Sequence, residues 1–353
     1  MVRDNVTGLI WEVKQAKDDI KDYMNPHDSD NTYTWYDSNP ETNYGYTGTY
    51  NDGKNTEMVI KQINESRFGG FGDWRLPSIK ELASLAALER SLPAINQFYF
   101  RGIHGDWSEF YWSSTSYAST GYAWDVNFNY GHDLYLPKDF SHYVRAVRGG
   151  QCRSFDHLVI NADQTVTDTS TGLIWSVETS ETKMIWEMAL KYCETYSLAD
   201  YSDWRLPERE ELRSIVYYTR FYSAIDRNYF ETQSEFYWTS TSHAYNTVNA
   251  RSVLFIDGSD FHQAKDSSYF VRAVRGGQCR SFGDLIIWSP MQADILITGT
   301  SLPISWDTST IKGNVNITLS RQGGKSDTFE TIISETANDG HYDWTITVHP
   351  TVC

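Results

Sequence analysis

The sequence predicts an α+β fold made of two copies of one domain, followed by a small all-β module. A set of motifs recurs once in unchanged order, and within each copy helix-like patterns precede strand-like patterns. The last part of the chain alternates apolar and polar residues between Gly, Asn, Asp and Pro. We therefore expect the first copy at 1–155, the second at 156–283 and the all-β module at 284–353.

Four sequence blocks define the duplication. TGLIW at Thr7–Trp11 recurs at Thr171–Trp175, DWRLP at Asp73–Pro77 recurs at Asp203–Pro207, SEFYW at Ser108–Trp112 recurs at Ser234–Trp238, and the twelve residues Val144–Phe155 recur unchanged at Val271–Phe282. Because the blocks keep their order over such long offsets, they indicate a domain duplication rather than a short-period solenoid.

The offsets between the copies locate an insertion in the first one. The offset is 164 residues at TGLIW and 130 at DWRLP, so the first copy carries 34 extra residues between these blocks. The extra residues fall in 22–53, a stretch rich in Asp, Asn, Tyr, Thr and Gly. We interpret this stretch as a long surface loop, of a length that is usually functional or mobile.

Two helices are predicted around each DWRLP turn. Ser78 and Glu81 have the spacing of a capping box, and apolar residues follow at helical spacing: Ile79, Leu82, Leu85 and Leu88. An earlier helix is clearest in the second copy, where one face carries Ile185, Met188, Ala189, Tyr192, Cys193 and Tyr196.

Strands are predicted in the later half of each copy. Ala123–Asp133 matches Ala250–Asp260, with Val126 and Phe128 on the core face of the first copy and Asp125, Asn127 and Asn129 pointing outward. A strand and turn at 159–168 precede the second copy, while the first copy begins without them. We interpret both ends of the chain as truncated. The tail predicts strands near 285–288, 302–306, 315–319 and 342–348.

Taken together, TGLIW, the helix pair, DWRLP, the FYWSST or FYWTST block and VRAVRGG resemble the C-terminal domain of Legionella collagen-like protein. The resemblance covers nearly all of 1–282. It implies a C-type-lectin-like fold in each copy, with two helices beside a mixed, mostly antiparallel sheet. It also implies a bacterial secreted or surface protein with a binding or adhesion role, often toward polysaccharides. The tail resembles immunoglobulin-like modules of the Ser-Thr-rich cell-wall and GPI-anchored type, which implies an extracellular spacer.

The cysteines depart from the pattern of that family. Members often carry one Cys in the helix before DWRLP and one in the VRxVR block. The second copy keeps Cys193, but the first has Ile63 at that position, and the VRxVR blocks have Ala146 and Ala273. The usual bridge is therefore not expected. Four cysteines in the chain allow three pairings, and spacing does not choose among them.

Composition excludes several functions. The chain has 30 Lys and Arg against 46 Asp and Glu, a net charge of −16, which opposes binding to nucleic acids and to polyanionic sugars. No apolar run reaches the roughly 18–20 residues of a membrane helix. No GxSxG, HExxH or P-loop motif occurs, and the nine histidines form no i, i+4 ligand pair beside an acid. We expect no enzymatic activity.

The candidate ligand-binding residues are polar or aromatic side chains on the strands and loops at 117–135 and 243–262, most of which differ between the copies. They are Tyr117, Tyr122, Trp124, Asn127, Asn129, Tyr130, His132 and Tyr135 in the first copy, and His243, Tyr245, Asn249, Arg251, Asp257 and His262 in the second. Aromatic rings on an outer face suit stacking on sugars or a hot spot for a protein partner. The alternative is that they are ordinary surface residues.

Two further candidate sites have a structural alternative. The alternating carboxylates Asp28 and Asp30 could coordinate Ca²⁺ through oxygen, although they also suit a solvated loop. We expect no other cofactor. The DWRLP arginines Arg75 and Arg205 could hold an anion, but the pattern favours a structural ion pair before a helix.

The sequence therefore predicts a secreted or cell-surface adhesin that recognises a glycan or a protein through its lectin-like modules. The alternative is a structural subunit of an extracellular filament or surface layer. In that case neighbouring chains would complete the truncated domains by self-assembly.

Overall fold

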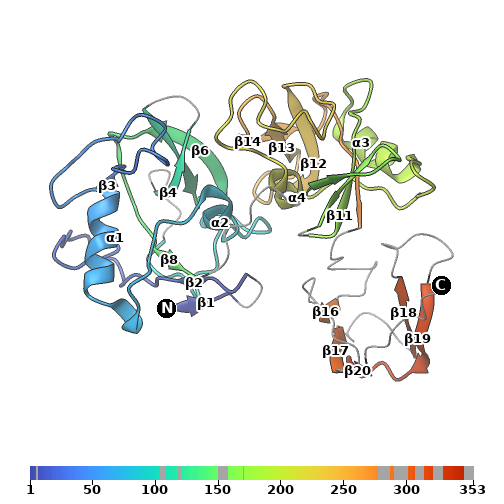
Figure 1. The fold of residues 1–353 in the computed structure, drawn as a ribbon, viewed down its shortest axis with the longest axis horizontal. Helices are drawn as coiled ribbons and strands as arrows, with labels where there is room; N and C mark the ends of the chain where they lie inside the picture. The colour runs from blue at the N-terminus through green and yellow to red at the C-terminus, as the bar shows by residue number, and fades with distance from the viewer. Residues whose placement is uncertain are drawn as a thin grey trace. The chain divides into compact units, whose positions relative to one another are not determined.

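The computed structural model describes residues 1–4, 7–103, 109–117, 121–149, 158–169, 171–276, 287–289, 301–306, 314–320 and 329–345 (Figure 1). Within these ranges the chain forms four α-helices and many short antiparallel strands, which confirms the α+β class. It divides into two compact units. The first comprises Met1–Cys152, Glu178–Leu190 and Leu206–Arg272, and the second comprises Arg153–Val177, Lys191–Arg205 and Ala273–Cys353.

The first repeat lies within the first unit. Its helical segments are α1 (Thr56–Glu65), the 3-10 turn η1 (Phe68–Gly70) and α2 (Ile79–Ala83). Its strands are β1 (Val2–Arg3), β2 (Ile10–Trp11), β3 (Tyr33–Thr34), β4 (Phe110–Ser116), β5 (Tyr122–Asn127), β6 (His132–Pro137), β7 (Ser141–His142) and β8 (Val147–Arg148). They form three antiparallel sheets in the orders β1-β2-β8, β3-β7 and β4-β5-β6, and α2 packs beside the last of these (Figure 1).

The first unit also contains a matching part of the second repeat. Here α4 (Arg209–Ser214) packs beside an antiparallel sheet of order β12-β13-β14, whose strands are β12 (Phe236–Ser242), β13 (Asn249–Leu254) and β14 (Asp260–Ala264) (Figure 1). The strands predicted from Ala123–Asp133 and Ala250–Asp260 are present in both copies, where each forms a hairpin with the strand that follows. The other helix of this repeat is α3 (Trp186–Thr195).

The second unit has two groups of strands. The first group is a sheet of order β15-β11-β10-β9, built from β9 (Leu158–Ile160), β10 (Thr165–Asp168), β11 (Leu173–Ser176) and β15 (Val274–Gly276). It contains the strand and turn predicted before the second copy. The tail forms one sheet of β16 (Ile287–Ser289), β17 (Ser301–Trp306) and β20 (His341–Thr345), and another of β18 (Val315–Ser320) and β19 (Phe329–Thr336).

The DWRLP turn has the structural role predicted for it. The Trp74 indole is buried and donates to the Phe68 carbonyl at 3.0 Å. Arg75 forms two parallel bonds of 2.7 Å to Glu81, the residue that also completes the capping box with Ser78. One carboxylate therefore fixes both the start of α2 and the turn before it.

Two helix predictions need correction. The helix after DWRLP ends at Ala83 rather than Leu88, because the chain turns back so that Ala86 bridges Ile95. In α3, Ala189 and Cys193 are buried as expected, but Met188 and Ile185, which directly precedes the helix, are exposed. Cys193 is a free, buried thiol, and Cys152, Cys279 and Cys353 lie outside the described residues. The domain boundaries predicted at 155/156 and 283/284 also fall outside them and stay predictions.

The alternation predicted for β5 is only half correct. Val126 and Phe128 are buried in the core as expected, but Asp125, Asn127 and Asn129 are buried too. The reason is that this strand is central in its sheet and both of its faces are covered. On the side expected to face solvent, Asp125 lies 3.6 Å from His142 of β7. Burial raises the pKa of Asp125 well above its ordinary value.

The insertion at 22–53 is anchored in the core, so it is more than the surface loop predicted. Tyr33 and Trp35 are both buried, and β3 pairs with β7. The Trp35 indole donates to the Ser113 carbonyl at 2.9 Å, and the Trp112 indole donates to the Tyr33 carbonyl at 2.8 Å. These reciprocal bonds satisfy both buried indoles and hold the insertion against β4.

We predict that Gly48→Ala destabilises the protein because of this anchoring. Gly48 has φ +89°, and an added Cβ would lie 2.2 Å from the Trp35 carbonyl oxygen. Backbone strain and the clash together should lower the free energy of unfolding by about 2–5 kcal/mol. Gly53→Ala is the matched control, since Gly53 also has a positive φ but has open space around it. Urea unfolding followed by tryptophan fluorescence would measure both, and equal losses would contradict the anchoring.

Candidate functional site

Most of the predicted ligand residues meet where the two repeats contact each other inside the first unit. We call this contact, centred on β6 and β14, the repeat interface. The Asp133 amide of β6 donates to the Asp260 carboxylate of β14 at 2.7 Å. These two aspartates occupy equivalent positions in the two copies. The interface therefore brings matching edges of the two sheets together.

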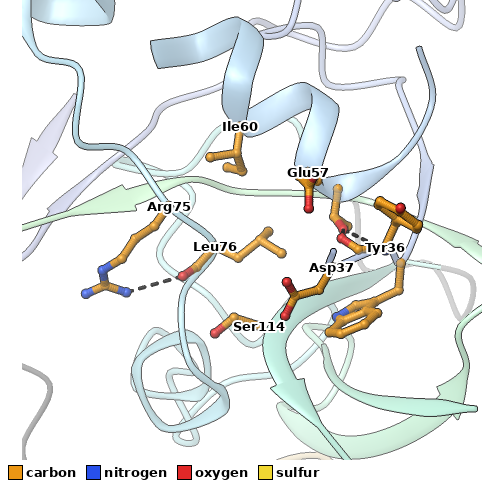
Figure 2. A pocket seen from close by; sticks show the side chains of 9 residues that line it. Tyr36, Asp37, Glu57, Ile60, Arg75, Leu76 and Ser114 are labelled. Atoms are coloured by element: carbon orange, nitrogen blue, oxygen red, sulfur yellow. Dashed lines mark hydrogen bonds between the residues drawn. The ribbon is translucent and has the colours of Figure 1, made fainter. Parts of the chain in front are cut away.

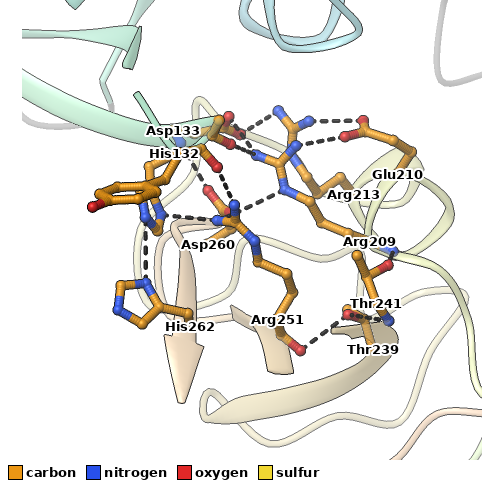
Figure 3. Close-up of polar contacts among 12 residues, drawn as sticks. His132, Asp133, Arg209, Glu210, Arg213, Thr239, Thr241, Arg251, Asp260 and His262 are labelled. Carbon is orange, nitrogen blue, oxygen red and sulfur yellow. Dashed lines mark hydrogen bonds and ion pairs between the residues drawn. The ribbon is translucent and has the colours of Figure 1, made fainter. Parts of the chain in front are cut away.

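A buried ionic network holds the repeat interface (Figure 3). Arg209 of α4 donates to Asp260 at 2.8 Å, to Asp133 at 2.8 Å and to the Gly131 carbonyl at 2.8 Å, and all three side chains in these ion pairs are fully buried. Arg213 pairs with Asp133 and donates to Glu210 at 2.8 Å. Burial alone would raise the pKa of Asp260, but the Arg209 and Arg251 guanidiniums outweigh it and hold that pKa below its ordinary value.

Two of the predicted aromatic residues of the first copy, Tyr117 and Trp124, pack against the second copy. Trp124 is fully buried, and its indole donates to the Tyr218 carbonyl at 2.9 Å. Tyr117 stacks on Tyr135 with centroids 3.9 Å apart and meets Phe221 edge-on at 6.0 Å. Rings expected on an open outer face are thus enclosed by the neighbouring repeat.

Three predicted histidines also converge at the repeat interface. His132, His243 and His262 present ring nitrogens that all lie within 4.8 Å of one another. Arg251 donates to His132 Nδ1 at 3.0 Å, and it also donates to the Tyr130 carbonyl (Figure 3). Burial and then Arg251 lower the pKa of His132 to about 3 and that of His243 to about 4, so both rings are neutral at pH 7.

The predicted ligand residues differ in how accessible they are. Tyr122, Tyr245 and His262 are exposed, whereas His132, Tyr135 and Asn249 are half-buried. The others are buried: Tyr117, Trp124, Asn127, Asn129, Tyr130, His243, Arg251 and Asp257. Whether any of these side chains contacts a ligand stays a prediction, and the exposed and half-buried ones are accessible from solvent.

Asp28 and Asp30, the predicted calcium ligands, cap backbone amides in the insertion. The Asp28 carboxylate accepts hydrogen bonds from the Asp22 amide at 2.8 Å and from the Asp30 amide at 2.7 Å. Asp30 accepts from the Asp18 and Asp19 amides at 2.9 and 3.1 Å. These bonds favour the alternative interpretation, in which the acids stabilise the loop.

A second candidate surface lies within the first repeat, where the insertion meets α1 and the DWRLP turn. We call this cavity of about 210 Å³ the insertion hollow (Figure 2). Its lining is Trp35, Tyr36, Asp37, Thr56, Glu57, Ile60, Arg75, Leu76 and Ser114. Most of these side chains were not predicted as ligand residues. The length and composition of the insertion were the only sequence signals for them.

The geometry of the insertion hollow is set by local hydrogen bonds. The Thr56 hydroxyl at the start of α1 accepts a hydrogen bond from the Tyr36 N–H at 2.9 Å. It also donates to the Tyr36 carbonyl at 2.8 Å. Glu57 accepts from the Ser38 amide at 2.8 Å. Beside the hollow, Tyr36 meets Tyr50 edge-on with centroids 5.3 Å apart. The insertion also exposes three tyrosines: Tyr44, Tyr46 and Tyr50.

The two repeats are related α+β modules, and among the described residues no helix is long and apolar enough to cross a bilayer. Residues 1–148 and 164–275 match the family model described as Lcl C-terminal domain, and the chain belongs to this family. The match in two segments agrees with tandem copies. The family is associated with cell-surface or secreted proteins, which indicates a surface or secreted binding protein. No curated protein matches the chain.

We predict that Asp133→Asn strongly destabilises the first unit. The change removes the buried partner of Arg209 and Arg213, and breaking a buried pair in this way costs about 3–5 kcal/mol. Asp73→Asn is the control, because Asp73 pairs with Arg148 at the surface and its loss should have little effect. Thermal unfolding of both variants would measure the difference. Similar melting temperatures for the two would contradict a network that depends on burial.

Proposed function

We propose that this chain is a bacterial cell-surface or secreted adhesin that binds a glycan or protein ligand, and that the insertion hollow is its principal contact. The observation that supports this most is the hollow itself. It is lined in part by an insertion that the second copy lacks, and the exposed Tyr50 packs against the lining residue Tyr36. Large rings with a polar tip are the side chains most enriched where proteins bind partners.

The lining of the hollow favours a small polar group with an apolar face. Ile60 and Leu76 supply apolar wall, while Ser114 and Asp37 supply hydroxyl and carboxylate oxygens. A volume of about 210 Å³ is below the roughly 300–1,000 Å³ of drug-sized pockets, so it suits one sugar ring or one side chain. The carboxylates and the net charge of −16 favour a neutral or cationic group over a polyanion.

The proposal extends to the architecture around the hollow. We propose a C-type-lectin-like fold for each repeat, supported by the helix beside an antiparallel hairpin sheet in both copies. We propose an immunoglobulin-like spacer for the tail, supported by the antiparallel pairing of β16, β17 and β20. The proposed role is binding without catalysis. Self-assembly into a filament or surface layer stays a prediction, which the solution size of the full-length protein would test.

We predict that Tyr50→Ala weakens ligand binding at least tenfold. The test is an array of neutral, amino and sulfated glycans together with bacterial and host surface proteins, followed by titration of the best ligand. Tyr50 is 60% exposed beside the hollow, and Tyr222, at 69% exposed in the second repeat, is the matched control. Loss of the Tyr50 side chain should remove stacking area while leaving the fold unchanged.

A third variant separates the two candidate surfaces. Tyr245, 65% exposed, is the most accessible aromatic among the predicted ligand residues at the repeat interface. Binding that is lost in Tyr245→Ala but kept in Tyr50→Ala would move the ligand site to the repeat interface. Binding that is unchanged in both variants would overturn the assignment to either surface.

A further inference from the structure

Three imidazoles from distant parts of the chain converge at the repeat interface. His132 begins β6, His243 directly follows β12, and His262 lies in β14. The three ring nitrogens nearest one another all lie within 4.8 Å. The first histidine belongs to one repeat and the other two to the other, so the cluster exists only when the repeats are in contact.

The spacing of these nitrogens is close to that of a metal site. Zinc binds imidazole nitrogen at about 2.0–2.1 Å, so two ligands of a tetrahedral ion lie about 3.3–3.4 Å apart. His132 Nε2 and His262 Nδ1 are already 3.3 Å apart. The widest separation between two of these ring nitrogens is within 4.8 Å. It would have to shrink by about 1.4 Å to reach the tetrahedral spacing, which a small rotation of one ring provides.

The cluster also has a buried polar atom without a partner and a path to solvent. His243 is buried, and its Nε2 has no hydrogen-bond partner among the described residues. A buried polar atom in that condition is rare and calls for an explanation. His262 is exposed, so an ion could reach the cluster from solvent on that side.

We infer that His132, His243 and His262 form a binding site for one borderline-soft divalent transition ion, such as Zn²⁺, with the two repeats sharing its ligands. Imidazole nitrogen suits zinc, copper and nickel, whereas Ca²⁺ and Mg²⁺ prefer oxygen ligands. Three protein ligands leave the fourth position of a tetrahedral ion for water or for a group of a bound partner. This site is separate from the insertion hollow.

Two hydrogen bonds compete with the ion. Arg251 donates to His132 Nδ1 at 3.0 Å, and the Asn246 amide donates to His243 Nδ1 at 3.1 Å. Each bond favours the tautomer that carries its hydrogen on Nε2, the atom that would face the ion. Binding must therefore exchange these tautomers and release both bonds. Arg251 can retain its bonds to Asp260 and to the Tyr130 carbonyl when this happens.

The test is a Zn²⁺ titration of the metal-free full chain, by calorimetry in excess Mg²⁺ so that the surface carboxylates are occupied. We expect one Zn²⁺ per chain and an increase in melting temperature on binding. His262→Gln should weaken binding at least tenfold, because it removes an exposed ligand that the fold does not need. His341→Gln is the matched control, since His341 is also exposed but lies outside the cluster. Absorption of bound Co²⁺ would report the geometry of the ligands.

The outcomes decide between the site and adventitious binding. Zn²⁺ binding that is unchanged in His262→Gln and in the double variant His243→Gln, His262→Gln would overturn the proposal. So would the absence of micromolar binding in the unmodified chain. Arg251→Met should tighten binding, because it removes the competing donor and a nearby positive charge. Unchanged or weaker binding in that variant would overturn the hydrogen-bond competition proposed for Arg251.

Discussion

The arrangement of the first unit depends on one buried cation, the guanidinium of Arg209. A buried guanidinium is stable only if several acceptors replace the water it has lost. Arg209 obtains them from both repeats, as Asp260 comes from its own copy while Asp133 and the Gly131 carbonyl come from the other. Separating the repeats would leave this charge without two of its acceptors. The main effect of the ionic network is therefore to fix how the two repeats contact each other. Its contribution to the net free energy of folding is smaller.

The network also explains why the two copies have diverged. The positions in the first repeat that correspond to Arg209 and Arg213 hold Ile79 and Ala83, so only one copy brings the cations. Trp124 and Arg251 are likewise equivalent positions, and each reaches a backbone carbonyl of the opposite repeat. At an interface between two copies of one domain, equivalent positions can contact different partners, and the residues at these positions then differ between the copies. Differences between copies thus identify the repeat interface at least as well as a ligand site.

Features set by local sequence could be predicted, whereas features set by long-range contact could not. The capping box at Ser78 and the hairpin strands follow from spacing within a few residues. The burial of Asp125 could not be predicted, because the covering residue, His142, approaches from another sheet. The histidine cluster joins His132 to His243 and His262, both more than a hundred positions further along the chain, and no spacing rule relates the first to the other two. The anchoring of the insertion through Trp35 likewise depends on β4, far along the chain.

The sheet of order β4-β5-β6 links the two candidate surfaces. At one edge, β4 carries Ser114 of the insertion hollow. The carbonyl of the preceding Ser113 accepts the hydrogen bond from the Trp35 indole that anchors the insertion. At the other edge, β6 carries His132 and Asp133 of the repeat interface. The central strand β5 pairs with both edge strands, although the register with β4 shifts between Trp112 and Ser116. The hollow therefore needs only the first copy, whereas the histidine site needs both, and the sheet is the one element that both surfaces require.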